Sequence, residues 1–230
     1  MEHLKLLSVL IRGWTATFRL PFLYSGTGIT SPVPPYSTLL GMIGNLAARE
    51  IYPNDIGKIG YIFRSDSIAT DLERTVRYSV NRGVFSRNTD KKRYGIVSRQ
   101  FHINPVLELY IENLDMKDVF ENPQNPPTLG RSQDLCWIES VKIVDAIAVK
   151  SAPISGTLLP FSQVGASGLI LVLPEYFSNN KIGLTRTTEK MGRFQAVRFN
   201  KNAPYLNANT PSDFYSIDGT DKYVYLHSFR

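Results

Sequence analysis

The sequence predicts an α+β protein, and three observations lead to that prediction. A run rich in β-branched and aromatic residues from Leu4 to Leu20 is typical of a strand. Apolar residues at helical spacing follow from Ser37 to Glu50, and most later elements are short alternating or β-branched runs. The chain has 230 residues with 43% hydrophobic content, enough for one large domain or two small ones with a substantial core.

The segment SPVPPYSTLLGMIG, residues 31–44, connects the first strand, which we expect to bend near Gly13, to the first helix. Its three prolines favour extended backbone, and Ser37 is the predicted N-cap. Gly41 and Gly44 each weaken the helix by about 1 kcal/mol relative to alanine. Two uses for these glycines stay open, close packing on a sheet and close approach of a nucleic acid. The predicted buried face comprises Leu39, Leu40, Ile43, Leu46 and Ala47.

The later elements are mostly predicted strands. A loop is expected from Asn122 to Gly130, a short helix from Ser132 to Ser140, and a long surface loop from Asn200 to Asp221. The predicted strands are Ile59–Phe63, Leu72–Val80, Phe101–Glu112, Val141–Val149, Leu169–Leu173, Phe194–Phe199 and Tyr223–Phe229.

The order strand, helix, strand, strand is half of a ferredoxin-like, or RRM-like, arrangement. We therefore expect an N-terminal ferredoxin-like domain over residues 1–120 and a β-rich C-terminal region over residues 121–230.

Composition excludes several classes of protein. The single cysteine, Cys136, excludes an internal disulfide and a zinc site built from several cysteines, and it fits a cytoplasmic setting. No apolar run reaches membrane-spanning length, and the N-terminal MEHLKLLSVLIRGW is predicted to be a strand rather than a signal peptide. No histidine and carboxylate cluster has metal-ligand spacing, and no glycine loop of the nucleotide-binding type occurs. We expect no metal and no cofactor.

The positive charge is concentrated in one segment. The formal net charge is +6, and residues 74–99 contain eight basic residues opposed only by Asp90. Tyr78, Phe85 and Tyr94 lie between the basic residues, so phosphate neutralisation and base stacking are both available. The segment predicts a hairpin that binds nucleic acid, and the alternative is a solvated basic loop. The basic residues are Arg74, Arg77, Arg82, Arg87, Lys91, Lys92, Arg93 and Arg99.

Two further segments are candidates for binding an anion. Gly130 allows an unusual turn that would place Arg131 and Ser132 at a helix start, where free amides and the helix dipole attract anions. The sequence MGRF, residues 191–194, could present Arg193 and backbone amides from a tight turn, although a plain hairpin turn is the alternative.

Support for catalysis is weak. His102, in the sequence FHINP, is the one histidine considered as a general base for a metal-independent ribonuclease. Nothing in the sequence brings a second catalytic group to it, so a structural histidine is the preferred interpretation.

The segment FRLPFLYSGTGITSPVPPYSTLLGMIGNLA, residues 18–47, resembles the N-terminal signature of the CRISPR-associated protein 5 family. This RAMP-superfamily subunit caps the guide RNA in type I interference complexes (Cascade). RQFHINPVLELYI, residues 99–111, is similar to the strand after the family's protruding thumb, and TLGRSQDL, residues 128–135, to its Leu-Gly-Arg/Lys-Ser segment. The sequence looks closest to the I-B-like branch. The signature matches at Phe18, Arg19, Pro35, Ser37, Thr38, Leu39 and Gly41, with Tyr36 inserted before Ser37.

The resemblance implies a ferredoxin-like domain with a thumb hairpin over residues 74–99. It also implies that the protein holds the 5′ handle of the CRISPR RNA, contacts the backbone and large subunits, meets target DNA only indirectly and binds no membrane. Most subtypes use this subunit without catalysis, and one uses it to process precursor CRISPR RNA. The expected RNA contacts are the basic residues of the thumb together with Arg19, Ser37, Thr38, Gly130, Arg131, Ser132 and Arg193.

Overall fold

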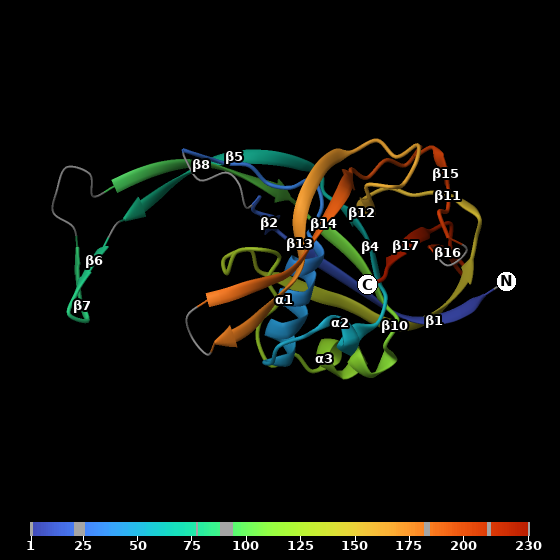
Figure 1. Cartoon of the computed structure of the whole chain (residues 1–230), viewed down its shortest axis with the longest axis horizontal. Helices are drawn as coiled ribbons and strands as arrows, with labels where there is room; N and C mark the ends of the chain where they lie inside the picture. The colour runs from blue at the N-terminus through green and yellow to red at the C-terminus, as the bar shows by residue number, and fades with distance from the viewer. Residues whose placement is uncertain are drawn as a thin grey trace.

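A β-rich body and a long two-stranded arm make up the structure (Figure 1). The arm is formed by β5 (Ser67–Val76) and β8 (Tyr94–Ile103), and a small hairpin of β6 (Tyr78–Asn81) and β7 (Val84–Arg87) lies beyond its outer end. None of the helices in the described ranges has the length and apolar character needed to cross a membrane. The computed structural model describes residues 2–20, 26–76, 78–87, 94–181, 185–210 and 213–229.

The body is built around a closed barrel with the strand order β1-β10-β16-β17-β4-β9. Its neighbouring strands are antiparallel throughout. The barrel takes strands from both sides of residue 120, and the domain boundary at that point stays a prediction. The strands are β1 (His3–Gly13), β4 (Ile59–Arg64), β9 (Val106–Ile111), β10 (Cys136–Ala148), β16 (Phe214–Ile217) and β17 (Tyr223–His227).

The main helix, α1 (Tyr36–Ala47), packs its predicted apolar face against the barrel. The predicted N-cap is wrong, because Pro35 occupies the N-cap position and its carbonyl accepts from Thr38 N and Leu39 N at 3.0 and 3.2 Å. Ser37 therefore lies within the first helical turn. The helix ends at Ala47, and the C-cap residue Ala48, with a left-handed φ of 51°, turns the chain back over Gly44.

Both faces of β1 are buried, which explains the nearly continuous apolar sequence of this strand. Leu7, Val9 and Ile11 belong to the cluster that includes the buried face of α1. Leu6 points to the opposite face of β1. There it belongs to a second cluster, with Tyr110, which takes residues from every barrel strand and fills the interior of the barrel. Burial of each such side chain stabilises the fold by about 1.5–3 kcal/mol.

The remaining elements flank the barrel. A three-stranded sheet has the order β12-β14-β13, β11 pairs with β15, and β2 and β3 join β8 at the base of the arm. The strands are β2 (Thr15–Ala16), β3 (Thr27–Gly28), β11 (Ser151–Pro153), β12 (Thr157–Pro160), β13 (Leu169–Lys181), β14 (Thr185–Val197) and β15 (Tyr205–Asn207). The short helices are α2 (Pro53–Ile56), η1 (Leu114–Met116) and α3 (Lys117–Glu121).

The predicted helix Ser132–Ser140 is wrong, because Cys136 already begins β10. Cys136 and Trp137 pair with Gly13 and Arg12 of β1, so a strand partner distant in sequence decides the local structure. Ser132 lies in a turn and caps no helix.

Three other predictions need correction. The tight turn MGRF lies inside β14, where Arg193 is paired with Val172 of β13. The predicted strand Phe101–Glu112 is two strands, separated at Asn104, whose φ is 49°. The predicted surface loop 200–221 contains β15 and β16, and its apolar residues Leu206 and Phe214 are buried.

Candidate nucleic-acid interface

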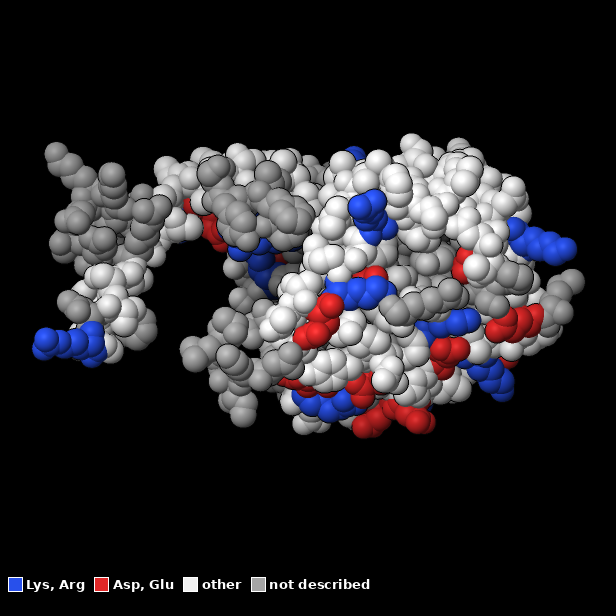
Figure 2. Space-filling model, in the orientation of Figure 1, with Lys and Arg blue, Asp and Glu red and all other residues white. Residues whose placement is uncertain are grey.

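A groove of about 520 Å³ lies where the arm joins the body. It is bordered by α1, the base of β8, the turn at residues 128–131 and β13, and we call it the α1 groove. Figure 2 shows Lys and Arg side chains in the hollow beneath the base of the arm. The α1 groove brings together six of the predicted contact residues, which come from four separate parts of the sequence: Arg19, Ser37, Thr38, Arg99, Gly130 and Arg131.

Two arginines of the α1 groove are held in place by Glu73 of β5. Arg99 Nε donates to Glu73 Oε2, and Arg131 Nη1 lies 3.8 Å from Glu73 Oε1. Asp71 of β5 is paired with Arg99 of β8, so their side chains lie on the same face of the arm. Glu73 follows two residues after Asp71 and lies on that face too, because successive side chains alternate between the two faces of a strand. A guanidinium carries five N–H donors, so both arginines keep donors for a phosphate after these pairs form.

The 128–131 turn is fixed from inside the protein by Asp134. Arg131 donates from Nε and Nη2 to the two carboxylate oxygens of Asp134, each at 2.9 Å, and Thr15 Oγ1 donates to the same carboxylate at 2.7 Å. Burial alone raises the pKa of Asp134, but these hydrogen bonds outweigh burial and hold the pKa below its ordinary value. Asp134 is therefore ionised near neutral pH and holds Arg131 at the groove.

Gly130 satisfies the predicted unusual turn but does not begin a helix. Its φ is 110°, and a Cβ placed on it would lie 1.8 Å from Thr17 O. The backbone of the turn therefore touches the chain after β2, and Thr17 N donates to Leu129 O at 3.1 Å. The predicted anion site at a helix start after Gly130 is wrong for this reason.

The two glycines of α1 have different uses. A Cβ on Gly44 would lie 2.9 Å from Arg49 O, so this glycine admits the returning chain after the helix. A Cβ on Gly41 would meet no atom within 4 Å, and Gly41 lines the α1 groove. A neighbouring cavity of about 470 Å³ shares Ser37, Gly41 and Phe177, so the groove continues along α1 towards Arg49.

Four groove residues were not identified from the sequence. Phe177 of β13 is 37% exposed and places an aromatic ring at the groove. Thr17 is buried, and its Oγ1 has no hydrogen-bond partner among the described residues. Met42 and Thr128 complete the set. An aromatic residue directly before the polar run Ser178-Asn179-Asn180 was the signal in the sequence for Phe177.

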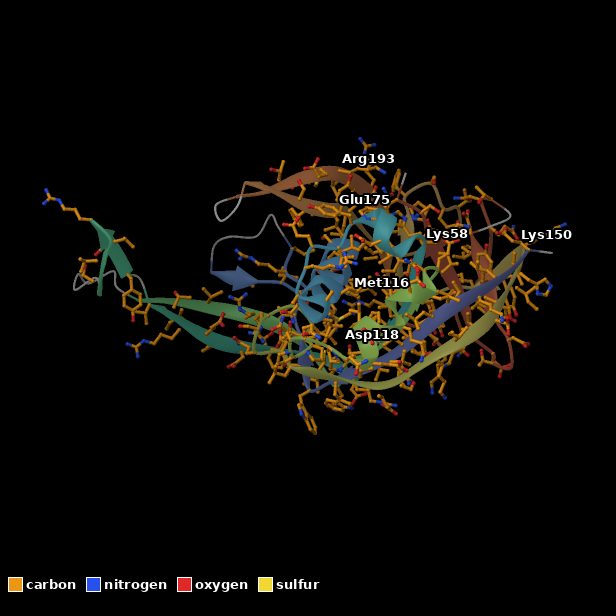
Figure 3. All side chains as sticks on the ribbon, turned by 90° about the horizontal axis from the view of Figure 1, so that it is seen from below. Lys58, Met116, Asp118, Lys150, Glu175 and Arg193 are labelled. Atoms are coloured by element: carbon orange, nitrogen blue, oxygen red, sulfur yellow. The ribbon has the colours of Figure 1, made fainter. Side chains whose placement is uncertain are left out.

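Four other predicted residues, all within the described ranges, lie outside the α1 groove. Arg74 lies on the arm face opposite Glu73, Arg82 is exposed in the β6–β7 turn with a φ of 48°, and Ser132 is exposed beside the groove. Arg193 points outward from β14, away from α1 (Figure 3). The other basic residues of the segment 74–99 lie outside the part of the chain that the structure describes: Arg77, Lys91, Lys92, Arg93 and the side chain of Arg87.

His102 has the environment of a structural histidine. It is 1% exposed and lies between the rings of Phe18 and Phe63. Nε2 donates to Ser31 O at 2.9 Å, and Nδ1 accepts from Ser65 Oγ at 2.9 Å, so neither ring nitrogen is available to a substrate. In the described ranges no group of three potential metal ligands comes together either.

Burial of His102 makes a pH-dependent contribution to stability. Burial lowers the pKa of His102, so the unfolded chain takes up a proton more readily than the folded chain. The stabilising contribution is complete above the unfolded pKa of about 6.5 and is lost as the pH falls below it. We expect the unfolding free energy of His102→Gln to depend less steeply on pH in this range than that of the unmodified protein. Urea titrations test this, with His3→Gln as the control, and equal slopes would contradict it.

No family model matches the sequence, and no curated protein matches it. Solved structures are similar to it, and two examples follow. One is a chain of a CRISPR RNA-guided surveillance complex, with a TM-score of 0.54 and 14% identity over 82% of this chain and 88% of that chain. The other is a CRISPR protein from Archaeoglobus fulgidus, with a TM-score of 0.50 and 10% identity over 98% of this chain and 100% of that chain. The chain therefore has a β-rich fold with few helices that is also found in CRISPR proteins.

Proposed function

We propose that the protein is a non-catalytic RNA-binding subunit of a type I CRISPR interference complex, in the CRISPR-associated protein 5 family and its I-B-like branch. In this proposal it caps and holds the 5′ handle of the CRISPR RNA. The observation that carries the proposal is the α1 groove, which gathers six residues proposed from separate segments of the sequence. The likeness of the fold to CRISPR proteins supports it.

The α1 groove has the chemistry that a single RNA strand requires. Arg19, Arg99 and Arg131 offer guanidinium donors for phosphates, and Ser37 and Thr38 offer hydroxyls. Phe177 offers a ring on which an unpaired base can stack, and such stacking is worth about 1–3 kcal/mol. An RNA duplex lacks unstacked bases, so we expect the groove to prefer single strands.

The arm of β5 and β8 corresponds in this proposal to the thumb. It is inserted between barrel strands β4 and β9, so a strand seated in the α1 groove would pass directly under its base. The backbone and large subunits are the proposed protein partners, and pairing of the guide with its target would supply sequence specificity.

A catalytic role as a metal-independent endoribonuclease is the alternative. The occupied ring nitrogens of His102 favour the non-catalytic role. Purified protein incubated with labelled repeat RNA and a chelator should leave the RNA intact, and specific cleavage that His102→Ala abolishes would establish the alternative instead.

The thumb assignment predicts the result of changing Lys91, Lys92 and Arg93 together to alanine. Loss of three phosphate contacts on a single strand should weaken binding and reduce the slope of log affinity against log salt by about 2. Fluorescence anisotropy of a labelled repeat-derived RNA at several salt concentrations measures both effects.

A matched control removes three exposed lysines that lie outside the arm: Lys5 of β1, Lys142 of β10, and Lys150, which lies at the end of the molecule opposite the arm in Figure 3. The control should keep the original slope. If the two triple variants behave alike, the thumb does not bind the RNA.

A further inference from the structure

A second groove lies on the other side of the base of the arm. Arg99 of β8 faces the α1 groove, whereas Gln100 and His102 border a cavity of about 490 Å³. A further cavity of about 640 Å³ adjoins it, and the two share Arg64, Ser65, Asp66 and Phe199. Because Arg99 and Gln100 are consecutive in one strand, their side chains point to opposite faces of the arm. We call the two joined cavities the outer groove.

Both tryptophans of the chain lie at the outer groove. Trp14 is 71% exposed and Trp137 is 42% exposed, with ring centroids 5.7 Å apart. Their backbones are held firmly, because Trp14 O accepts from Asn104 N at 3.0 Å and Trp137 is paired with Arg12 in the barrel. Trp14 lies in the bend between β1 and β2, and Trp137 lies on β10. Two large aromatic rings exposed side by side are an unusual use of surface and indicate a binding partner.

The charge around these rings is positive. Arg64, Arg198 and Lys201 are exposed at the outer groove, and no acidic group in the described part of the chain forms an ion pair with them. Glu139 pairs with Arg12. Asp66 lines both cavities and accepts from the neutral amide of Asn104 at 2.8 Å, so one carboxylate stands against the three cations and the net charge of these groups is positive.

We propose that the outer groove binds a second segment of single-stranded nucleic acid, with bases stacked on Trp14 and Trp137 and phosphates on Arg64, Arg198 and Lys201. Exposed rings flanked by unpaired cations match the two requirements of single-strand binding. Tryptophan and arginine also occur at protein interfaces. Three exposed cations without an ion-pair partner in the described part of the chain need a polyanion, and this favours nucleic acid over a protein partner. The proposal goes beyond the function of the α1 groove and does not depend on it.

The tryptophans themselves supply the readout. The chain contains two tryptophans, both at the outer groove, so their fluorescence reports on this site alone. We expect a short unlabelled oligouridylate to quench this fluorescence to saturation. The variant in which Arg64, Arg198 and Lys201 are all changed to glutamine should raise the half-quenching concentration about tenfold or more, since three phosphate contacts are lost.

Two comparisons separate this site from others. Gly41→Glu, which is designed to weaken binding in the α1 groove, should leave the quenching curve in place. Polyglutamate, which has negative charge but no bases, should quench little. The proposal is wrong if RNA binding saturates by anisotropy without a change in tryptophan emission, or if polyglutamate quenches as strongly as RNA. It is also wrong if the emission responds only to a protein subunit of the complex.

Discussion

Replacing Gly41 with glutamate is expected to weaken binding of single-stranded RNA about tenfold or more while the protein remains folded. Gly41 lines the α1 groove, and a Cβ at this position meets no atom within 4 Å, so the new side chain has room to enter the groove. There it places a negative charge where phosphates are proposed to lie. A penalty of about 1.4 kcal/mol already gives a tenfold loss of affinity. Anisotropy titrations with a labelled repeat-derived RNA measure the effect.

Gly41→Gln is the matched control, because it has nearly the same size and shape without the charge. It should weaken binding less than Gly41→Glu. Gly41→Ala should raise the unfolding free energy by about 1 kcal/mol, since alanine favours a helix interior over glycine. If Gly41→Glu binds RNA as tightly as the unmodified protein, and circular dichroism shows both folded, the α1 groove is not the RNA site.

Replacing Gly130 with alanine is expected to lower the unfolding free energy by about 3 kcal/mol or more, from backbone strain and a steric clash together. The φ of 110° lies outside the range that residues with a Cβ readily adopt. The Cβ would also lie 1.8 Å from Thr17 O, so the turn must move away from the chain after β2. That movement breaks the hydrogen bond from Thr17 N to Leu129 O and displaces Arg131 from the groove. Urea unfolding measures the loss.

Gly219→Ala is the control for backbone strain alone. Gly219 has a φ of 68°, and a Cβ there meets no atom within 4 Å. Its substitution should cost only about 1–2 kcal/mol, the strain of a left-handed conformation. Equal losses for the two variants would mean that the contact between Gly130 and Thr17 is not tight in solution.

The parts of the fold that could be predicted are those decided locally. The apolar face of α1 and the strands β1, β4 and β17 follow from periodicity and from β-branched and aromatic content, and the structure contains all four. The start of β10 could not be predicted, because its structure depends on pairing with β1, more than a hundred residues away in the chain. The prediction that Ser37 is the N-cap of α1 was also wrong, because Pro35 can serve as the N-cap without a side-chain hydrogen bond.

In the candidate site, too, the local features could be predicted from the sequence and the long-range contacts could not. Arg19, Arg99 and Arg131 could be proposed from charge and from motif, since each lies in a recognisable segment. The residues that position these arginines, Glu73 and Asp134, could not be predicted from the sequence. Both are acidic, and only the folded chain brings them beside Arg99 and Arg131. The outer groove gave no sequence signal, because Trp14 and Trp137 meet only through the pairing of β1 with β10.

Photocrosslinking tests the central claim, that the α1 groove holds single-stranded RNA, most directly. A repeat-derived RNA carrying 4-thiouridine would be irradiated with the purified protein, and the crosslinked peptides identified by mass spectrometry. We expect crosslinks in residues 36–47 of α1, in the 128–131 turn and at Phe177, and we expect Gly41→Glu to lose them. Crosslinks confined to the outer surface of the barrel, with none in these segments, would contradict that claim.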